Sequence, residues 1–167
     1  LCVLAKGEQG WKNMMKASSA SYMPQYFYRK PRLDLERLAS FSKGEFIAFS
    51  GHLGSDLADC VFEQPKLAYR AETYEDARTL VRADWAESVE KMIHKYQTLF
   101  GKENFYLEIQ LVDQDNLPAS TVVARILRHM GRKLGVPRVA TADSHYARQA
   151  DATDQRIILC AALNTTL

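Results

Sequence analysis

Short apolar segments alternate with longer amphipathic segments along this chain, and the alternation restricts the fold more than any other feature. The apolar segments cover residues 1–5, 45–51, 104–112 and 136–141. Runs of this length are typical of buried strands, whereas the segments between them carry helical periodicity. Strands and helices that alternate in this way form βαβ units around a parallel sheet. The sequence therefore predicts one α/β unit, without repeats, low-complexity tracts or linkers.

The amphipathic segments predict several helices, of which the longest is the clearest. Five helices are expected over 8–23, 33–42, 74–100, 118–134 and 148–163, and residues 52–62 are expected to form a short helix or a helical turn. Within 74–100, apolar residues recur at i, i+3 and i+4, so this face should pack on the sheet. The stripe consists of Leu80, Val81, Trp85, Val89, Met92, Ile93 and Tyr96. Thr73 with Asp76 resembles a capping box, and Gly101 is a plausible end of the helix.

Composition limits the class of protein more than it defines the function. A length of 167 residues and a hydrophobic content of 47% are typical of one globular domain. The net charge of only +2 means that any contact with DNA would need a local basic patch. Cys2, Cys60 and Cys160 are few and far apart, which favours buried free thiols in a reducing compartment. No apolar run approaches the length of a membrane span. We therefore expect a cytoplasmic protein without membrane contact.

Potential metal ligands follow two of the predicted strands. His52 comes directly after 45–51, while Asp143 and His145 follow 136–141. The carboxyl ends of parallel strands share one edge of a sheet, which is where α/β proteins place their sites. A carboxylate with two imidazoles suits zinc, manganese or iron better than calcium. The alternative is structural, because Asp-x-His also occurs as an Asx-turn or helix cap with a hydrogen-bonded histidine.

Two further features have both a functional and a structural interpretation. Arg29, Lys30 and Arg32 are interleaved with aromatic residues, a pattern that can grip phosphate or stack on a base. The same segment, predicted to be irregular because of Pro31, could equally be a solvated loop. Glu108, in the third strand, could orient a metal-bound histidine or simply pair across the sheet. Apart from this metal chemistry, the sequence assigns no catalytic residue.

Five blocks of the sequence occur in an order typical of a known family. They are "LCVLAKGEQGWKNMMKASSASYM", "FYRKPRLDLERL", "FIAFSGHLGSDL", "NFYLEIQ" and "LGVPRVATADSHYARQADATDQRIILCAALNTTL". Together they resemble the PHP domain of the bacterial DNA polymerase III alpha subunit family. The corresponding family blocks include "FYYKPRIDxExL", "LIALSGCLxGEI" and "xGIPLVATNDVHY". The resemblance identifies residues 1–167 as the carboxyl-terminal portion of a PHP domain. It implies a distorted (β/α)7 barrel that holds a metal cluster at its strand ends.

The resemblance carries three metal ligands over to this chain. Asp143 and His145 match the family's last ligand motif, and His52 stands where the family usually has cysteine and sometimes histidine. A nitrogen would then replace a sulfur, which changes the preferred metal more than it prevents binding. The remaining family ligands and the polymerase core, with its magnesium site, correspond to positions outside residues 1–167.

The function that the resemblance implies is DNA-directed DNA synthesis by the parent protein, with metal-dependent phosphoesterase or 3′-5′ exonuclease chemistry in the PHP domain. The implied partners are DNA, the proofreading exonuclease, the sliding clamp and other replicase subunits. Two alternatives are a non-catalytic domain that docks the proofreading subunit and a free-standing phosphatase of small phosphate esters. Four strands form an open sheet, so the isolated residues are expected to be inactive and to associate through a sheet edge.

Overall fold

A four-stranded sheet forms the centre of the protein in a computed structural model that describes residues 1–110 and 117–166. Its strands are β1 (Cys2–Ala5), β4 (Phe46–Phe49), β5 (Phe105–Gln110) and β6 (Arg138–Thr141), in the order β1-β4-β5-β6. The four predicted strands and the α/β class are confirmed. Residues 111 and 112, at the predicted end of the third strand, lie outside the described residues. β4 pairs parallel with β5, and β5 pairs parallel with β6.

The first strand departs from the predicted parallel arrangement. β1 pairs antiparallel with β4, with Cys2 opposite Phe49 and Ala5 opposite Phe46. The reason lies in the connection, because two packed helices, α1 (Gly7–Ser21) and α2 (Leu35–Ser42), stand between the strands. One helix between two strands carries the chain back to the opposite end of the sheet, so the next strand runs parallel to the first. Two helices carry the chain there and back again, so the next strand starts at the end where the first one finished and runs antiparallel to it.

A β-hairpin occupies the segment that was predicted to be irregular. β2 (Phe27–Tyr28) pairs antiparallel with β3 (Lys30–Pro31), and Arg29 turns the chain at a φ of 59°. Pro31 is compatible with this position because a two-stranded ribbon leaves its outer edge unpaired. Asp34 then caps α2 by accepting a hydrogen bond of 2.6 Å from the backbone N–H of Arg37.

Two long helices cover the sheet and contribute a large part of the core. α6 (Trp85–Phe100) contacts β4 and β5, and α7 (Pro118–Leu134) contacts β5 and α5 (Tyr74–Thr79). Fully buried residues from the helices and strands meet there: Phe46, Val89, Ile93, Tyr96, Phe105, Leu107, Leu127 and Met130. As predicted, α7 starts at a proline and ends before Gly135, whose φ of 66° suits a helix end that glycine favours.

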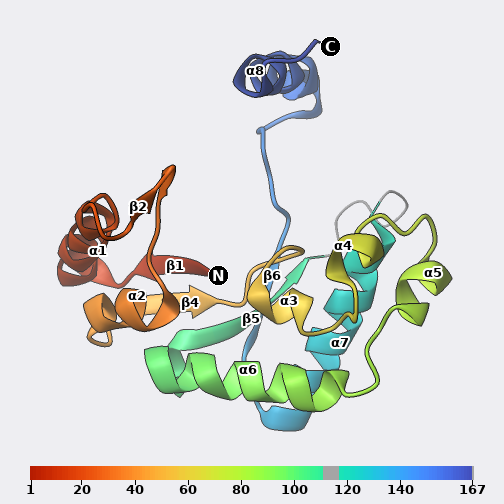
Figure 1. Ribbon diagram of the computed structural model, residues 1–167, viewed down its shortest axis with the longest axis horizontal. Helices are drawn as coiled ribbons and strands as arrows, with labels where there is room; N and C mark the ends of the chain where they lie inside the picture. Colours follow the sequence, from red (N-terminus) through yellow and green to blue (C-terminus); the bar gives the residue numbers. More distant parts are fainter. Residues whose placement is uncertain (111–116, 167) are drawn as a thin grey trace.

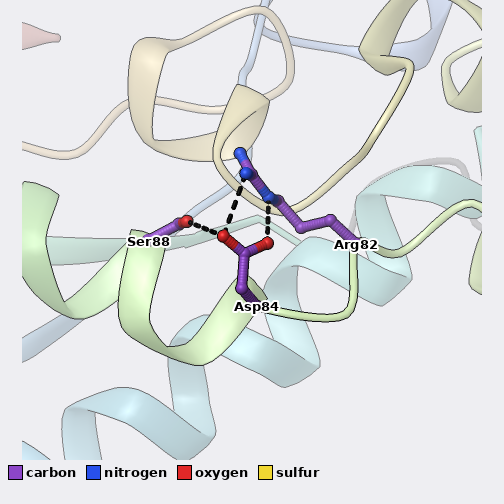
Figure 2. A network of polar contacts seen from close by, with 3 residues as sticks. All are labelled: Arg82, Asp84 and Ser88. Atoms are coloured by element: carbon purple, nitrogen blue, oxygen red, sulfur yellow. Dashed lines mark hydrogen bonds and ion pairs between the residues drawn. The ribbon is translucent and has the colours of Figure 1, made fainter.

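The predicted helix over 74–100 is in fact two helices, α5 and α6. Between them, Val81 forms an antiparallel bridge with Phe62, and the N–H of Arg82 donates to the carbonyl of Val61 at 3.1 Å. The backbone of this segment is therefore bonded to a distant segment instead of to its own helical turn. Figure 2 shows the start of α6, where the guanidinium group of Arg82 donates two hydrogen bonds to the Asp84 carboxylate. The same carboxylate accepts a hydrogen bond from the Ser88 hydroxyl.

The apolar stripe of that predicted helix is accordingly divided. Val89, Ile93 and Tyr96 of α6 are fully buried. Leu80, Val81, Trp85 and Met92 are only partly buried at the border of the core. At the start of α5, the predicted cap is present, since the Thr73 hydroxyl accepts from the N–H of Asp76 at 3.1 Å. Gly101 ends α6, also as predicted.

Three short helical segments complete the body of the protein. Within the short helix or helical turn predicted for 52–62, only α3 (Asp56–Asp59) is helical, and it starts at Ser55, whose hydroxyl accepts from the N–H of Ala58. α4 (Pro65–Ala68) was not predicted. A 3-10 turn, η1 (Lys102–Asn104), leads from α6 into β5.

The C-terminal arm, residues 142–166, stands apart from this body. After β6 the chain runs away from the sheet to η2 (Gln149–Asp151) and α8 (Ala152–Leu163), as the blue end of Figure 1 shows. None of the described residues of the arm is buried. Ile157, Ile158 and Leu163 of α8 expose between 49% and 65% of their surface.

The structure tests the predictions about the cysteine thiols and about membrane-spanning segments. All three cysteines are free, as expected, but the prediction that they are buried is wrong: Cys2 is exposed, and Cys60 and Cys160 are half-buried. Cys2 lies on the outer strand β1, which is covered less than the inner strands. Among the described residues, no helix combines the length and apolar character required to cross a membrane.

Candidate metal-binding site

The predicted ligands follow strands that point the same way. Because β4, β5 and β6 are parallel, their carboxyl ends lie at one edge of the sheet. His52 follows β4, Glu108 lies near the end of β5, and Asp143 follows β6. Neighbouring strands are about 4.8 Å apart, so the ends of β4 and β6 are separated by about 10 Å with β5 between them. The candidate site is centred on β5.

A tight turn after β4 presents His52 at this edge. Gly51 has a φ of 79°, and a Cβ on it would lie 3.1 Å from the side chain of Ser55, so both conformation and space favour glycine. The turn leaves the imidazole of His52 exposed while Gly51 and Ser55 are buried. His52 lines a small pocket together with Glu108 and Gln110 of β5 and with residues of α7.

Glu108 is held at this edge of the sheet by hydrogen bonds of both its backbone and its side chain. Its backbone N–H donates to the Ser50 hydroxyl at 2.8 Å, and its Oε1 accepts from the Thr141 hydroxyl at 2.7 Å. The side chain is only 9% exposed. Among the described residues, no hydrogen-bond donor reaches its second oxygen, Oε2. Buried carboxylate oxygens are normally paired, so this atom is one that a ligand could satisfy.

Asp143 and His145 form a local unit at the start of the C-terminal arm. Both side chains are exposed, and Asp143 has a φ of 49°, a conformation that aspartate tolerates better than most residues. Nδ1 of His145 lies 2.6 Å from the backbone carbonyl oxygen of Asp143. Because a carbonyl only accepts, Nδ1 is the donor of this hydrogen bond, and Nε2 is the nitrogen that can face a metal. The hydrogen-bonded histidine of the structural alternative is thus present, and it is compatible with metal binding.

The three predicted ligands do not form a ready ligand group in the part of the chain described here. Across residues 1–110 and 117–166, no three His, Cys, Asp or Glu side chains are placed to hold a metal ion together. His52 shares its pocket with Glu108, and Asp143 with His145 lies on the segment that leaves the sheet after Thr141. The donor types still fit a divalent ion of mixed nitrogen and oxygen preference. The assignment of the three ligands remains a prediction.

The basic residues Arg29, Lys30 and Arg32 lie on the exposed hairpin beside α1. The guanidinium groups of Arg29 and Arg32 stand 5.5 and 5.4 Å from the centre of the Tyr28 ring. This stacking holds two of the positively charged side chains against an aromatic ring. No carboxylate among the described residues forms an ion pair with Arg29, Lys30 or Arg32, so their charges are not neutralised by a neighbouring side chain. Whether phosphate binds there stays a prediction.

Sequence reasoning missed two hydroxyl residues and one pocket. Ser50 and Thr141 hold Glu108 from the strands on either side, and their positions at neighbouring strand ends were the only available signal. An open pocket of about 690 Å³ lies beside α3 and α4. In its wall, the hydroxyl of Tyr69 donates to Asp59 at 2.5 Å, and burial followed by this hydrogen bond raises the pKa of Tyr69. No motif of the sequence marks that pocket.

Comparison with known proteins identifies the family. The sequence model of the PHP domain matches residues 1–111, and the chain therefore belongs to the PHP domain family. The chain is 36% identical over 160 residues to the DNA polymerase III subunit alpha of Treponema pallidum, covering 96% of this chain and 12% of that protein. The subunit alpha of Thermus aquaticus is 32% identical over 167 residues, again covering 12% of the relative.

A third relative is also much longer than this chain. The DNA polymerase III subunit alpha of Deinococcus radiodurans is 34% identical over all 167 residues of this chain and over 11% of its own length. The chain thus spans about an eighth or a ninth of the curated relatives that it matches. The family match covers 1–111, so the extension of the domain to residue 167 stays a prediction.

Proposed function

We propose that these residues are part of the PHP domain of a DNA polymerase III alpha subunit, the protein that extends DNA primers in replication. Within that domain, His52, Asp143 and His145 are proposed as ligands of zinc, manganese or iron, with the other ligands supplied from outside residues 1–167. Magnesium would serve the polymerase site elsewhere in the parent. The observation that carries the metal proposal is the pocket shared by His52 and the buried carboxylate of Glu108 at the carboxyl edge of the sheet.

The proposed reaction at this edge is hydrolysis of a phosphoester, with a 3′-terminal DNA phosphodiester as the substrate. Bound metal ions would supply Lewis acidity and an activated water. The residues of this chain would hold the ions and position them: Nε2 of His145 is left free by the bond of Nδ1 to Asp143, and the Gly51 turn directs His52 outward. Partners proposed with the parent are DNA, the sliding clamp and the proofreading exonuclease.

The direct test uses the full-length protein and its Asp143→Ala variant. After dialysis against a weak chelator, we expect bound zinc, manganese or iron in the wild-type protein and reduced content in the variant, measured by elemental analysis. Metal-dependent release of nucleotides from 3′-labelled DNA should fall in parallel. Asp154→Ala, an exposed aspartate of α8, is the matched control and should retain both properties.

A non-catalytic docking role is the second candidate. It is favoured by the lack of any three-residue ligand group in residues 1–110 and 117–166. Wild-type protein that holds no metal under these conditions, yet retains polymerase activity, would support docking and contradict the hydrolytic proposal.

The hairpin formed by β2 and β3 is proposed to contact DNA phosphate in the parent protein. Support comes from Arg29 and Arg32, which are stacked on Tyr28 without ion-pair partners in the described chain. Replacing both arginines by alanine should weaken DNA binding and lower the slope of log affinity against log salt by about 2, since each phosphate contact adds roughly one unit. An unchanged slope, measured by fluorescence anisotropy, would show that the hairpin is only a solvated surface.

A further inference from the structure

Glu108 joins the two segments that carry the proposed ligands. Its N–H is bonded to Ser50, two residues before His52, and its Oε1 is bonded to Thr141, two residues before Asp143. Both bonds reach from β5 to a neighbouring strand, so they fix the backbone and the side chain of Glu108 relative to β4 and β6. The carboxylate therefore stands between the two halves of the candidate site in one defined orientation.

The second carboxylate oxygen of Glu108 differs from the first in its bonding. Oε2 is buried, and none of the described residues donates a hydrogen bond to it. The side chain lines the pocket that His52 also lines, together with Gln110, whose amide N–H donates to Oε1 of Glu108 at 3.4 Å and not to Oε2. A buried carboxylate oxygen and an imidazole nitrogen that line one small space are both electron-pair donors. Such a set attracts a cation and repels an anion, which identifies the class of ligand.

We propose that Glu108 is itself a ligand of the ion at His52, through Oε2, and not only a residue that orients a histidine. The proposal rests on the function proposed above, since it concerns the same metal site. It also explains how ligands after β4 and β6, whose ends are about 10 Å apart, can serve one cluster. Metal–oxygen and metal–nitrogen bonds are about 2 Å long, so an oxygen on the middle strand is needed to link ions at the two ends.

Two substitutions separate the two oxygens of Glu108 in the full-length protein. Glu108→Gln keeps the shape and can keep the bond to Thr141 through its amide oxygen, but it removes the charge and places an NH₂ group toward the pocket. Thr141→Val keeps the carboxylate and removes only its support. Glu87→Gln, on the exposed side of α6, is the matched control. Circular dichroism confirms that each variant is folded.

The readouts are Zn²⁺ affinity by calorimetric titration and the visible absorption of Co²⁺ bound in place of zinc. Loss of a supporting partner typically weakens metal affinity by about 10- to 100-fold, so Thr141→Val should fall in this range and Glu108→Gln should lose more. The Co²⁺ bands should shift in Glu108→Gln, because a ligand has changed, and keep their positions in Thr141→Val. Glu87→Gln should match the wild type.

The possible outcomes distinguish this proposal from the one on which it rests. If Asp143→Ala loses metal while Glu108→Gln binds Zn²⁺ within about twofold of the wild type, the site exists and Glu108 is not a ligand. Unchanged Co²⁺ bands in Glu108→Gln lead to the same conclusion. If wild-type protein binds no Zn²⁺, both proposals are overturned together.

Discussion

The central sheet and the C-terminal arm are built from similar residues but are held in very different ways. β4 and β5 bury Phe46 and Leu107 completely, whereas α8 of the arm leaves Ile158 64% exposed. Apolar burial is the main favourable term in folding, and each ordered residue costs conformational entropy. The strands at the centre of the sheet gain this term from their buried side chains, whereas none of the described residues of α8 is buried.

This difference runs through the candidate site. His52 and Glu108 belong to the well-packed edge, whereas Asp143 and His145 lie on the exposed arm. Thr141 is the last residue of β6, and its hydroxyl donates to Glu108 just before the chain leaves the sheet. One half of the candidate site therefore lies on segments held by the core, and the other half lies on the exposed arm.

Proteolysis should give the largest contrast between the two regions. Trypsin is expected to cut first after Arg148, whose side chain is 81% exposed. Cutting in α6 or α7 requires global unfolding, which for a domain costs on the order of 5–15 kcal/mol, whereas an exposed arm opens at almost no cost. Mass spectrometry of a time course identifies the first product. An initial cut within residues 85–134 would contradict the comparison.

Removing a buried ring and removing an exposed side chain should have unequal effects on stability. Phe46→Ala deletes a fully buried aromatic side chain and should lower the free energy of unfolding by about 3–5 kcal/mol. Ile158→Ala, on α8, should change it by less than about 0.5 kcal/mol. Urea denaturation followed by circular dichroism measures both. Equal losses would mean that α8 is as well packed as the sheet.

A helix cap at the border of the core should have an intermediate effect. Thr73→Ala removes the hydroxyl that accepts from the N–H of Asp76 and should lower the free energy of unfolding by about 1 kcal/mol. Thr153→Ala, in the exposed α8, removes a hydroxyl without that role and is the control. The same urea series measures the two variants, and an equal response would show that the cap contributes nothing.

The smallest effect should come from the surface pair of Arg82 and Asp84. The hydrogen bond from Arg82 lowers the pKa of the Asp84 carboxyl. A depressed pKa in the folded state stabilises above the unfolded pKa, and that contribution is lost as the pH falls through the folded value. Arg82→Ala should return the pKa of Asp84 toward its ordinary value, measured by NMR titration. The stability difference between the two proteins should be present at neutral pH and vanish in acid.

The sequence predicted the elements whose signals are local. The strands, the cap at Thr73 and the glycine ends of α6 and α7 all depend on residues within a few positions of one another. The break before Trp85 could not be predicted in this way, because Val81 is bonded to Phe62, far along the chain. The antiparallel β1 likewise depends on how two helices pack, which periodicity does not reveal.

The candidate site shows the same division. Position after a strand was enough to select His52 and Asp143, and the parallel pairing of β4, β5 and β6 places their segments at one edge. The periodicity of a sequence does not show which hydrogen-bond partner each polar atom has. The hydrogen bond from Thr141 to Glu108, and the absence of a donor to Oε2 among the described residues, follow from side-chain geometry alone.

The bridge between Phe62 and Val81 also determines where the chain can vary in length. It closes residues 63–80 into an excursion whose two ends are fixed side by side. Extra residues near Arg70 and Glu72, which are exposed, would lengthen the excursion without moving β4 relative to α6. Closing a loop of twice the length costs only about 0.6 kcal/mol more. This part of the surface can therefore accept insertions, or a fused reporter domain, while the sheet edge that carries His52 keeps its geometry.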